Sequence, residues 1–133
     1  MKLRTPHASI LTALSIACMP CAASAVEAAP SKQFSTCIDK AGGVTSSMLA
    51  CIGTENKLQH GRLNKAYQAL SASLQPARKT LLLEAQRAWI KFRDTNCSFY
   101  GDPDGGSMAR VSGQDCVMRA TTERARELES LKP

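Results

Sequence analysis

The sequence predicts an all-α protein, built as a long antiparallel helical hairpin with a third packed helix and two disulfides at one pole. Three observations predict this fold. Apolar residues recur at spacings of three and four from about residue 45 onward, which is the period of an amphipathic helix, and strand-like alternation is absent. A Gln75-Pro76 turn separates two long helical stretches. Four cysteines, beginning with Cys37, lie near the predicted helix ends.

Residues 1–25 have the features of a secretory signal peptide. Lys2 and Arg4 precede an apolar run, and Ala23-Ser24-Ala25 forms an A-x-A cleavage site. We expect cleavage after Ala25 and a periplasmic or secreted location. Ser15 fits poorly three positions before a lipidated cysteine, so we do not expect acylation of Cys18. No stretch approaches the roughly 20 apolar residues that a transmembrane helix needs.

Residues 26–43 are rich in alanine, serine and glycine, and we expect them to be extended or irregular apart from the neighbourhood of Cys37. Residues 44–133 form the predicted helical domain. Its first helix covers about residues 45–74, with Thr45 or Ser46 as the N-cap. Gly53 and Gly61 each weaken this helix by about 1 kcal/mol relative to alanine, so either is a candidate for a break or kink. The apolar stripe of this helix is Leu63, Tyr67, Leu70 and Leu74.

The second helix is predicted to run from about residue 77 to residue 98, because Pro76 is well placed to open it. The glycine-rich residues 101–113 are predicted to form a loop. Asp115 can then cap a last helix that ends near Leu131. The stripe of the second helix is Leu82, Ala85, Trp89 and Phe92, with Lys79, Arg87 and Lys91 on the solvent-facing side. The stripe of the last helix is Val117, Ala120, Thr121, Arg124, Leu128 and Leu131.

Residues 85–100 contain four of the six aromatic residues of the chain. We interpret this segment as the packing centre of the fold and not as a reactive site. Trp89 and Phe92 provide the bulk that a thin core of three helices needs. Arg93 and Asp94 point about 100° apart on a helix. We therefore expect each of them to reach a neighbouring helix or loop, and not the other.

Four cysteines remain after the predicted cleavage, and an even number in a small exported chain indicates two disulfides. In an antiparallel hairpin the second and third of these cysteines share one pole, and the segments that carry the other two lead to the same pole. Several pairings are therefore possible. Loop closure costs less for short loops and slightly favours Cys37 with Cys51 and Cys97 with Cys116.

Composition and motifs favour a binding protein over an enzyme. His60 is the single histidine after the leader, so we expect neither a catalytic triad nor a zinc site. The Asp102–Gly106 stretch lacks the further acids of a calcium loop, and no phosphate loop or nucleotide fingerprint is present. We therefore expect no catalytic residue, metal or cofactor. Without Lys2 and Arg4, fifteen basic residues face eleven acidic ones, a charge of about +4. These charges are interspersed, so we expect no nucleic-acid binding.

The sequence resembles the LprI-type family of lysozyme-inhibitor-like proteins of bacterial envelopes. The resemblance spans roughly residues 37–131 and is most specific in the run Gln86-Arg87-x-Trp89-x-x-x-Arg93-Asp94-x-x-Cys97. Further matching elements are Thr45-x-x-Met48-x-x-Cys51, Leu63-Asn64-x-x-Tyr67, and Cys116 with Thr122-x-Arg124-x-x-x-Leu128. The resemblance implies a small helical exported domain and, for some members, inhibition of lysozyme. An acidic residue often found shortly after the third cysteine is replaced here by Phe99 or Tyr100.

We therefore expect an exported, non-enzymatic binding protein with a protein partner, either a lysozyme inhibitor or another envelope-protective factor. The alternative is a structural or interaction module of the envelope, including an immunity protein against a delivered toxin. Many lysozymes are strongly basic, so a positively charged inhibitor would need a local acidic element. We hypothesise that the partner binds a flexible loop between Cys97 and Cys116; the alternative is that this loop is only a solvated connection between the last two helices. The contact residues predicted there are Tyr100, Asp102, Asp104, Met108 and Arg110.

Overall fold

The structure is a computed structural model that describes residues 29–131, and this part of the chain is entirely helical apart from its turns. The predicted signal peptide lies outside these residues. The helices are α1 (Lys32–Ala41), α2 (Thr45–Ser73), α3 (Pro76–Tyr100) and α4 (Gly106–Ser130). Within the described residues, no helix is long and apolar enough to cross a membrane. The all-α fold is confirmed, with four helices instead of the three expected.

Helix α1 corrects the expectation that residues 26–43 are extended or irregular. The Ser31 side chain caps its start by accepting a hydrogen bond from the Phe34 amide. Gly42 and Gly43 end it with positive φ angles of 55° and 81°, which glycine adopts without steric cost. Phe34 and Ala41 are buried on one face. The apolar residues of this segment have helical spacing. The segment is short, however, and its alanine and serine residues make the periodicity difficult to recognise in the sequence.

Helix α2 runs without interruption through Gly53 and Gly61. Neither Thr45 nor Ser46 caps it, because Val44 is the N-cap residue and contributes no side-chain hydrogen bond. The helix follows directly after the double-glycine turn. Its first backbone hydrogen bond is donated by the Met48 amide to the Val44 carbonyl. Burial of the predicted stripe is confirmed: Leu63 and Leu70 are buried, and Tyr67 and Leu74 pack beside them.

The connection between α3 and α4 is much shorter than the predicted loop of residues 101–113. Helix α4 begins at Gly106, and Asp115 lies within it, bound to Arg119 one turn later, instead of capping its start. Two glycines of this segment, Gly101 and Gly113, allow close packing. A Cβ added to Gly113 would lie 2.8 Å from the Gly101 Cα atom, so the end of α3 touches the first turns of α4. Glycine content here marks a helix contact, not a long loop.

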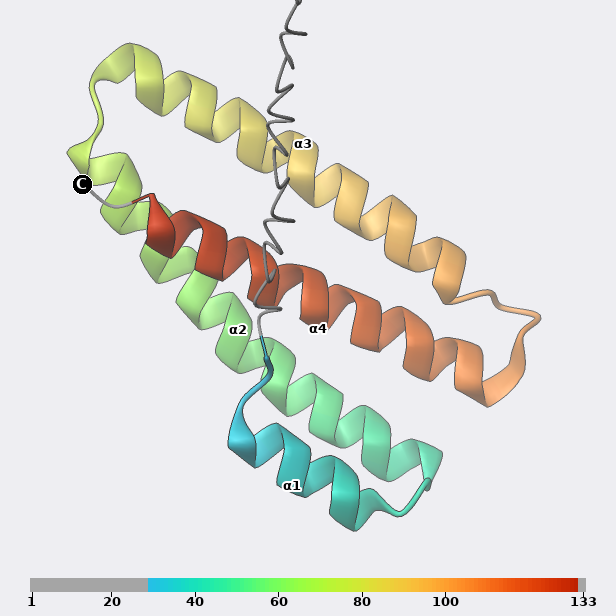
Figure 1. Cartoon of the computed structure of the whole chain (residues 1–133). Helices are drawn as coiled ribbons and strands as arrows, with labels where there is room; N and C mark the ends of the chain where they lie inside the picture. Colours follow the sequence, from blue (N-terminus) through green and yellow to red (C-terminus); the bar gives the residue numbers. More distant parts are fainter. Residues whose placement is uncertain (1–28, 132–133) are drawn as a thin grey trace, which may run out of the picture.

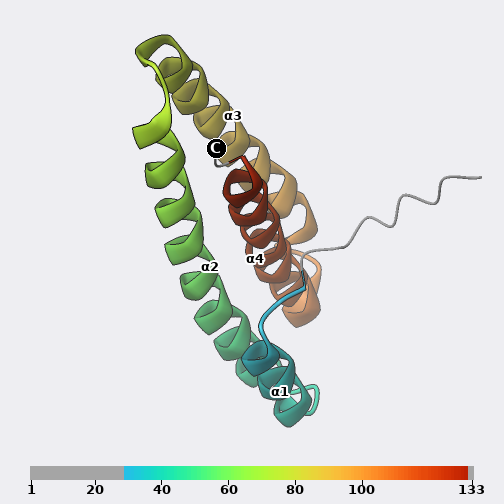
Figure 2. The same cartoon turned by 60° about the vertical axis from the view of Figure 1, so that its left-hand side comes forward.

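Helix α4 is the central element of the packing. It lies between α2 and α3 (Figure 1), and a second view shows the same order, with α1 folded back along the first part of α2 (Figure 2). The α2–α4 interface is the most extensive, followed by α3–α4 and α1–α2. The two long helices α2 and α3 form the predicted hairpin, but α4 fills the core between them. Thr121, Arg124 and Leu128 of the predicted α4 stripe are buried.

Two core clusters divide the molecule along its length. The first contains Phe34, Cys51, Ile52, Val111 and Met118, and so joins α1, α2 and α4. The second contains Leu63, Ala66, Leu70, Ala125 and Leu128, with Leu82 and Trp89 of α3 packed against it. Ile52 and Met118, early in α2 and α4, share the first cluster, whereas Leu70 and Leu128, near the ends of the same helices, share the second. Helices α2 and α4 therefore run parallel.

The two disulfides join Cys37 to Cys51 and Cys97 to Cys116. This is the pairing that loop closure slightly favours. Their Cα–Cα distances are 5.8 and 5.4 Å, within the normal range for a disulfide. One bridge fastens α1 to α2, and the other fastens the end of α3 to α4, both in the half of the molecule where α2 and α4 begin. The expectation of two disulfides at one pole is confirmed.

A chain of polar side chains crosses the core and holds α1 in place. Glu55 is 3% exposed. Its carboxylate accepts hydrogen bonds from the Ser31 amide (2.9 Å), the Ser31 hydroxyl (2.6 Å) and Gln59 (2.7 Å). Arg62 donates to Gln59 and to Glu129 of α4. Burial raises the pKa of Glu55, but the bonds from Ser31 and Gln59 and the charge of Arg62 together lower it below its usual value. The carboxylate is therefore ionised and fully bonded at neutral pH.

Candidate partner-binding site at the turn between α3 and α4

The end of α3 exposes large apolar side chains that the core does not use. Phe99 is 80% exposed and Tyr100 52%, and their rings meet edge to face with centroids 5.7 Å apart. Met108, in the first turn of α4, is 56% exposed. Exposed aromatic and methionine side chains are the residue types that anchor protein interfaces. We call these residues, together with Asp102, Asp104 and Arg110, the α3–α4 tip.

Two exposed acids give the tip its negative charge. The Asp102 side chain accepts a hydrogen bond from the Asp104 amide (2.9 Å), and the Asp102 carbonyl accepts one from the Gly105 amide (3.0 Å). These bonds fold residues 102–105 into a tight turn. Among the described residues, no group of three histidine, cysteine or acidic side chains is placed to hold a metal ion. The acids are therefore arranged on the surface of a short, well-defined turn.

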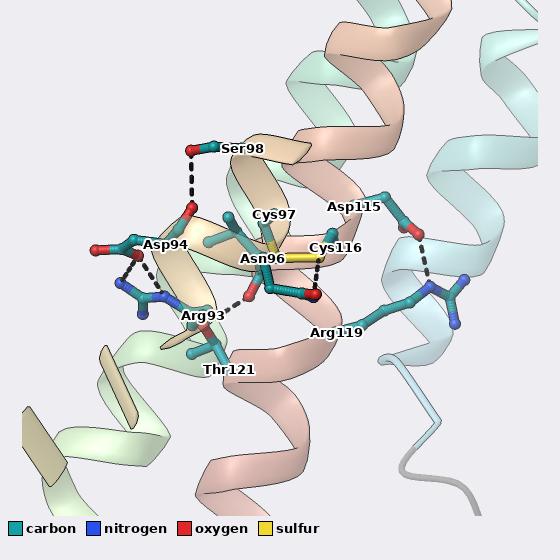
Figure 3. The surroundings of a disulfide bond; sticks show 10 residues. Arg93, Asp94, Asn96, Cys97, Ser98, Asp115, Cys116, Arg119 and Thr121 are labelled. Carbon is teal, nitrogen blue, oxygen red and sulfur yellow. Dashed lines mark hydrogen bonds and ion pairs between the residues drawn. A yellow bond between two sulfur atoms is a disulfide. The ribbon is translucent and has the colours of Figure 1, made fainter. Parts of the chain in front are cut away.

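An open hollow of about 610 Å³ lies beside the tip, between the end of α3, the first half of α4 and the start of α2. Arg110 and Asp94 line it with opposite charges, and Leu49 and Val117 give it apolar walls. Cys97 lies at its edge, where the disulfide to Cys116 fixes the two helices relative to each other (Figure 3). The hollow offers a partner side chain both apolar contact and a charge.

The structure corrects the picture of a flexible recognition loop. Tyr100 ends α3, whereas Met108 and Arg110 belong to α4, and only Asp102 and Asp104 lie in the turn. The five predicted contact residues nevertheless lie around one connection. Exposed Phe99 was not among them, although it lies beside Tyr100 in the sequence. The sequence did contain a signal for Phe99: it is an aromatic residue at or next to a position where the family often has an acid.

The family motif on α3 forms the packing contact with α4. Two guanidinium groups lie over the Trp89 ring, with Arg93 Cζ 5.0 Å and Arg124 Cζ 5.8 Å from its centroid. Arg124 also donates to Gln86 (3.0 Å) and to Glu127 (2.7 Å). The cation–π contacts add to the apolar burial of the indole. Gln86 and Trp89 therefore have a structural role, while Arg87 is exposed on the solvent side of α3.

Arg93 and Asp94 pair with each other, which contradicts the expectation that each reaches another element. Asp94 Oδ1 accepts from Arg93 Nε (2.8 Å) and Nη2 (2.7 Å), and Figure 3 shows the two side chains meeting on one side of α3. The long arginine side chain can fold back along the helix, so a separation of 100° at the backbone does not prevent the contact. The Arg93 side chain is 11% exposed and the Asp94 side chain 56%. The pair therefore presents its carboxylate to solvent near the hollow.

Phe92 is also placed differently from the prediction. It is 66% exposed, whereas Trp89 packs against the second core cluster. The packing face of α3 is rotated toward Gln86 and Arg93, two polar residues that a search for apolar periodicity passes over. Ala85 is exposed for the same reason. Lys79, Arg87 and Lys91 are exposed as predicted.

The described residues contain four cysteines and one histidine, and none of them belongs to the tip. All four cysteines of the described residues are in disulfides, so these residues contain no free thiol nucleophile. His60 lies on α2, and its pKa is lowered first by burial and then by the positive charge of Arg93, with Asp94 acting in the opposite direction. His60 is therefore mainly neutral near pH 7. What the tip offers a partner is exposed aromatic surface, two acids, one cation and a hollow.

Comparison with known proteins agrees with this architecture. A family model described as "Lysozyme inhibitor LprI" matches residues 37–128, which include both disulfides and almost all of α2 to α4. An uncharacterized protein of Rhizobium meliloti (strain 1021) is 32% identical over 95 residues, covering 61% of this chain and 68% of that protein. No solved structure matches. The match extends over most of the chain and includes the motif around Trp89, and the chain therefore belongs to the LprI lysozyme inhibitor family.

Proposed function

We propose that this protein is an exported binding protein that inhibits lysozyme and contacts it through the α3–α4 tip. The observation that carries the proposal is the family match over residues 37–128. Two disulfides support export, because such bonds persist in oxidising compartments. The exposed aromatic residues at one end of a disulfide-braced helix pair support a binding role.

The charges of the tip suit a glycosidase cleft with a basic surround. Lysozyme cleaves its substrate with two carboxyl groups flanking the scissile bond. Arg110, beside the hollow, is placed to pair with a carboxylate of that kind. Asp102 and Asp104 would then meet basic groups at the rim of the cleft. The chain as a whole carries a formal charge of +6, so its long-range field does not attract a basic enzyme. The local acids of the tip must therefore supply the electrostatic attraction at short range.

The first test is a cell-wall lysis assay with the mature, oxidised protein and a panel of basic and near-neutral lysozymes. We expect a concentration-dependent fall in lysis rate for at least one of them. The double variant Phe99→Ala/Tyr100→Ala should weaken this inhibition about tenfold or more, as interface aromatic residues do. The matched control Leu83→Ala/Ile90→Ala removes exposed apolar side chains elsewhere on α3 and should inhibit like the wild type. Full activity of every lysozyme at saturating protein would refute the proposal.

A further inference from the structure

Helix α3 carries a second apolar surface, distinct from its packing face and from most of the tip. Leu81 is 56% exposed and Phe92 66%, and the residues that share their side of the helix are exposed as well. The spacing alternates between four and three residues, which is the seam of a two-helix coiled coil. From Leu81 to Phe99 this seam extends about 27 Å along the helix. We call it the α3 seam; its members are Leu81, Ala85, Ala88, Phe92, Thr95 and Phe99.

The α3 seam lies beside the face that packs on α4. The packing residues Leu82, Trp89 and Arg93 each follow a seam residue by one position. Consecutive helix residues point about 100° apart, so the seam lies to one side of the core contact and not within it. Among the described residues, no core cluster includes a seam residue. An exposed apolar row of this length on a small domain marks an interaction surface.

We propose that the α3 seam binds a second copy of this chain, with the two α3 helices antiparallel. Setting Leu81 against Phe92 of the second copy also sets Ala85 against Ala88 of the second copy. A twofold axis repeats both contacts, as an isologous interface requires. The bulky residues then lie at the two ends of the contact and the alanines at its centre, where small side chains allow the helices to approach closely. The seam can therefore pack against a second copy of itself that runs in the opposite direction.

The charges beside the seam favour this register. Glu84 and Lys91 are exposed and flank the seam on the side away from α4, and the ion pairs described above use other residues. In the proposed register Glu84 lies next to Lys91 of the second copy, and the twofold axis forms this pair twice. Sliding the helices by one heptad, so that Leu81 meets Phe99, would place the two Lys91 side chains together. The charge pattern therefore selects the register in which Leu81 meets Phe92.

A hollow is present where the aromatic ring of the second copy would arrive. An open depression of about 340 Å³ lies at the Leu81 end of the seam, between α3 and the end of α4. Leu81 and Ala85 line it together with Leu74 and Leu131, the last of which is 55% exposed. Phe92 of the second copy, opposite Leu81, would cover this apolar surface. The exposed phenyl ring and the hollow are thus complementary in chemistry and in position.

This dimer would leave both α3–α4 tips accessible. The second copy's α3 begins at Pro76, which in this register lies level with Cys97, so the paired helices end two residues before the tip begins at Phe99. Because the helices are antiparallel, the two tips would point toward opposite ends of the dimer. A dimer would therefore present two binding ends. The proposal does not depend on the identity of the partner and can fail or succeed independently of lysozyme inhibition.

Sedimentation equilibrium of the mature, oxidised protein from 5 to 500 µM tests the proposal. The contact is short, so we expect a dissociation constant on the order of micromolar. Phe92→Asp should weaken dimerisation more than about tenfold, because it places a charge within the seam. The matched control Leu83→Asp lies on the same helix but about 180° from Phe92 and should leave the dissociation constant unchanged.

Charge reversal tests the register. Glu84→Lys and Lys91→Glu should each weaken the dimer by about three- to tenfold at low salt, because each creates two like-charge pairs. The double variant E84K/K91E restores opposite charges and should recover the wild-type dissociation constant. A monomer throughout the concentration range would overturn the proposal. A dimer that tolerates Phe92→Asp, or one that the double variant weakens further, would place the contact on another face or in another register.

Discussion

Gly61 and Gly113 both lie inside long helices but have opposite surroundings. A Cβ atom at Gly61 would meet nothing within 4 Å, whereas one at Gly113 would lie 2.8 Å from the Gly101 Cα atom. The disulfide between Cys97 and Cys116 prevents the two helices from separating to make room. We expect Gly61→Ala to stabilise the protein by about 0.5–1 kcal/mol through helix propensity. We expect Gly113→Ala to destabilise it by about 1–3 kcal/mol through overpacking.

Denaturant unfolding of the two glycine variants checks this prediction. The two substitutions add the same methyl group, so a difference of opposite sign isolates the close approach of α3 and α4. Equal stabilisation by both substitutions would contradict the helix contact at Gly113.

Trp89 is the residue on which the α3–α4 contact depends most. It packs against the second core cluster and is in cation–π contact with Arg93 and Arg124. We expect Trp89→Ala to lower the free energy of unfolding by about 2–4 kcal/mol, because both apolar burial and two cation–π contacts are lost. Phe92→Ala, on the exposed seam, should change it by less than about 0.5 kcal/mol at protein concentrations well below the dissociation constant of the proposed dimer, where the chain is monomeric. Comparable losses for the two variants would contradict the assigned packing face.

Apolar periodicity predicted the extent of α3, but the packing face that it predicted lies about 50° around the helix from the observed one. The reason is that Gln86, Arg93 and Arg124 occupy the contact with α4, and each satisfies its polar atoms with a hydrogen bond or with the indole ring. A method that scores hydrophobicity alone assigns such positions to solvent. The pattern around Trp89 therefore predicted which residues are structural, but not the partners of each one.

At the scale of elements, α1 depends on the bonds of one buried carboxylate. Ser31 caps α1 and donates two hydrogen bonds to Glu55 of α2. Because the pKa of Glu55 is lowered in the folded state from an ordinary value of 4.5, the unfolded chain binds the proton more readily. The stabilisation is therefore complete above pH 4.5 and is lost as the pH falls from 4.5 through the lower folded pKa.

Glu55→Gln should destabilise the protein by about 1–3 kcal/mol at pH 7, since a neutral amide replaces a bonded carboxylate. The difference between variant and wild type should shrink between pH 4.5 and pH 3. The matched control Glu123→Gln is on the exposed side of α4 and should follow the wild type at every pH. Thermal unfolding across this range measures the difference. A gap that stays constant down to pH 3 would contradict the ionised state of Glu55.

The long helices were predictable from sequence, whereas the short or glycine-rich ends were not. Helices α2 and α3 have sustained periodicity and a proline between them, and their observed bounds differ from the prediction by one or two residues. Helix α1 has only ten residues, and α4 begins at a glycine with positive φ. In both cases the deciding interactions come from other elements: the Cys37–Cys51 bridge and Glu55 for α1, and the contact with Gly101 for α4. These long-range interactions cannot be predicted from the local sequence pattern.

At the scale of the whole molecule, the two disulfides and the central α4 leave two surfaces for other molecules. The α3–α4 tip lies at the braced end, and the α3 seam runs along the outside of the helix. The sequence predicted the location of the tip from its cysteines, aromatics and acids, but described its base as a flexible loop. The seam was not predicted from the sequence because Phe92 was assigned to the core. Which large apolar residues are exposed can be decided only once the packing partner of each helix face is known.

The measurement that tests the central claim most directly is the affinity of the mature protein for the lysozyme that it inhibits most strongly. Calorimetric titrations at about 50 and 300 mM salt compare the wild type with Asp102→Asn/Asp104→Asn and with the control Asp39→Asn/Glu123→Gln, which makes the same charge change away from the tip. We predict that the tip variant binds about tenfold more weakly at low salt, that this difference narrows at high salt, and that the control binds like the wild type. Equal low-salt affinities for the tip variant and the wild type would contradict the assignment of the acidic turn to the binding site.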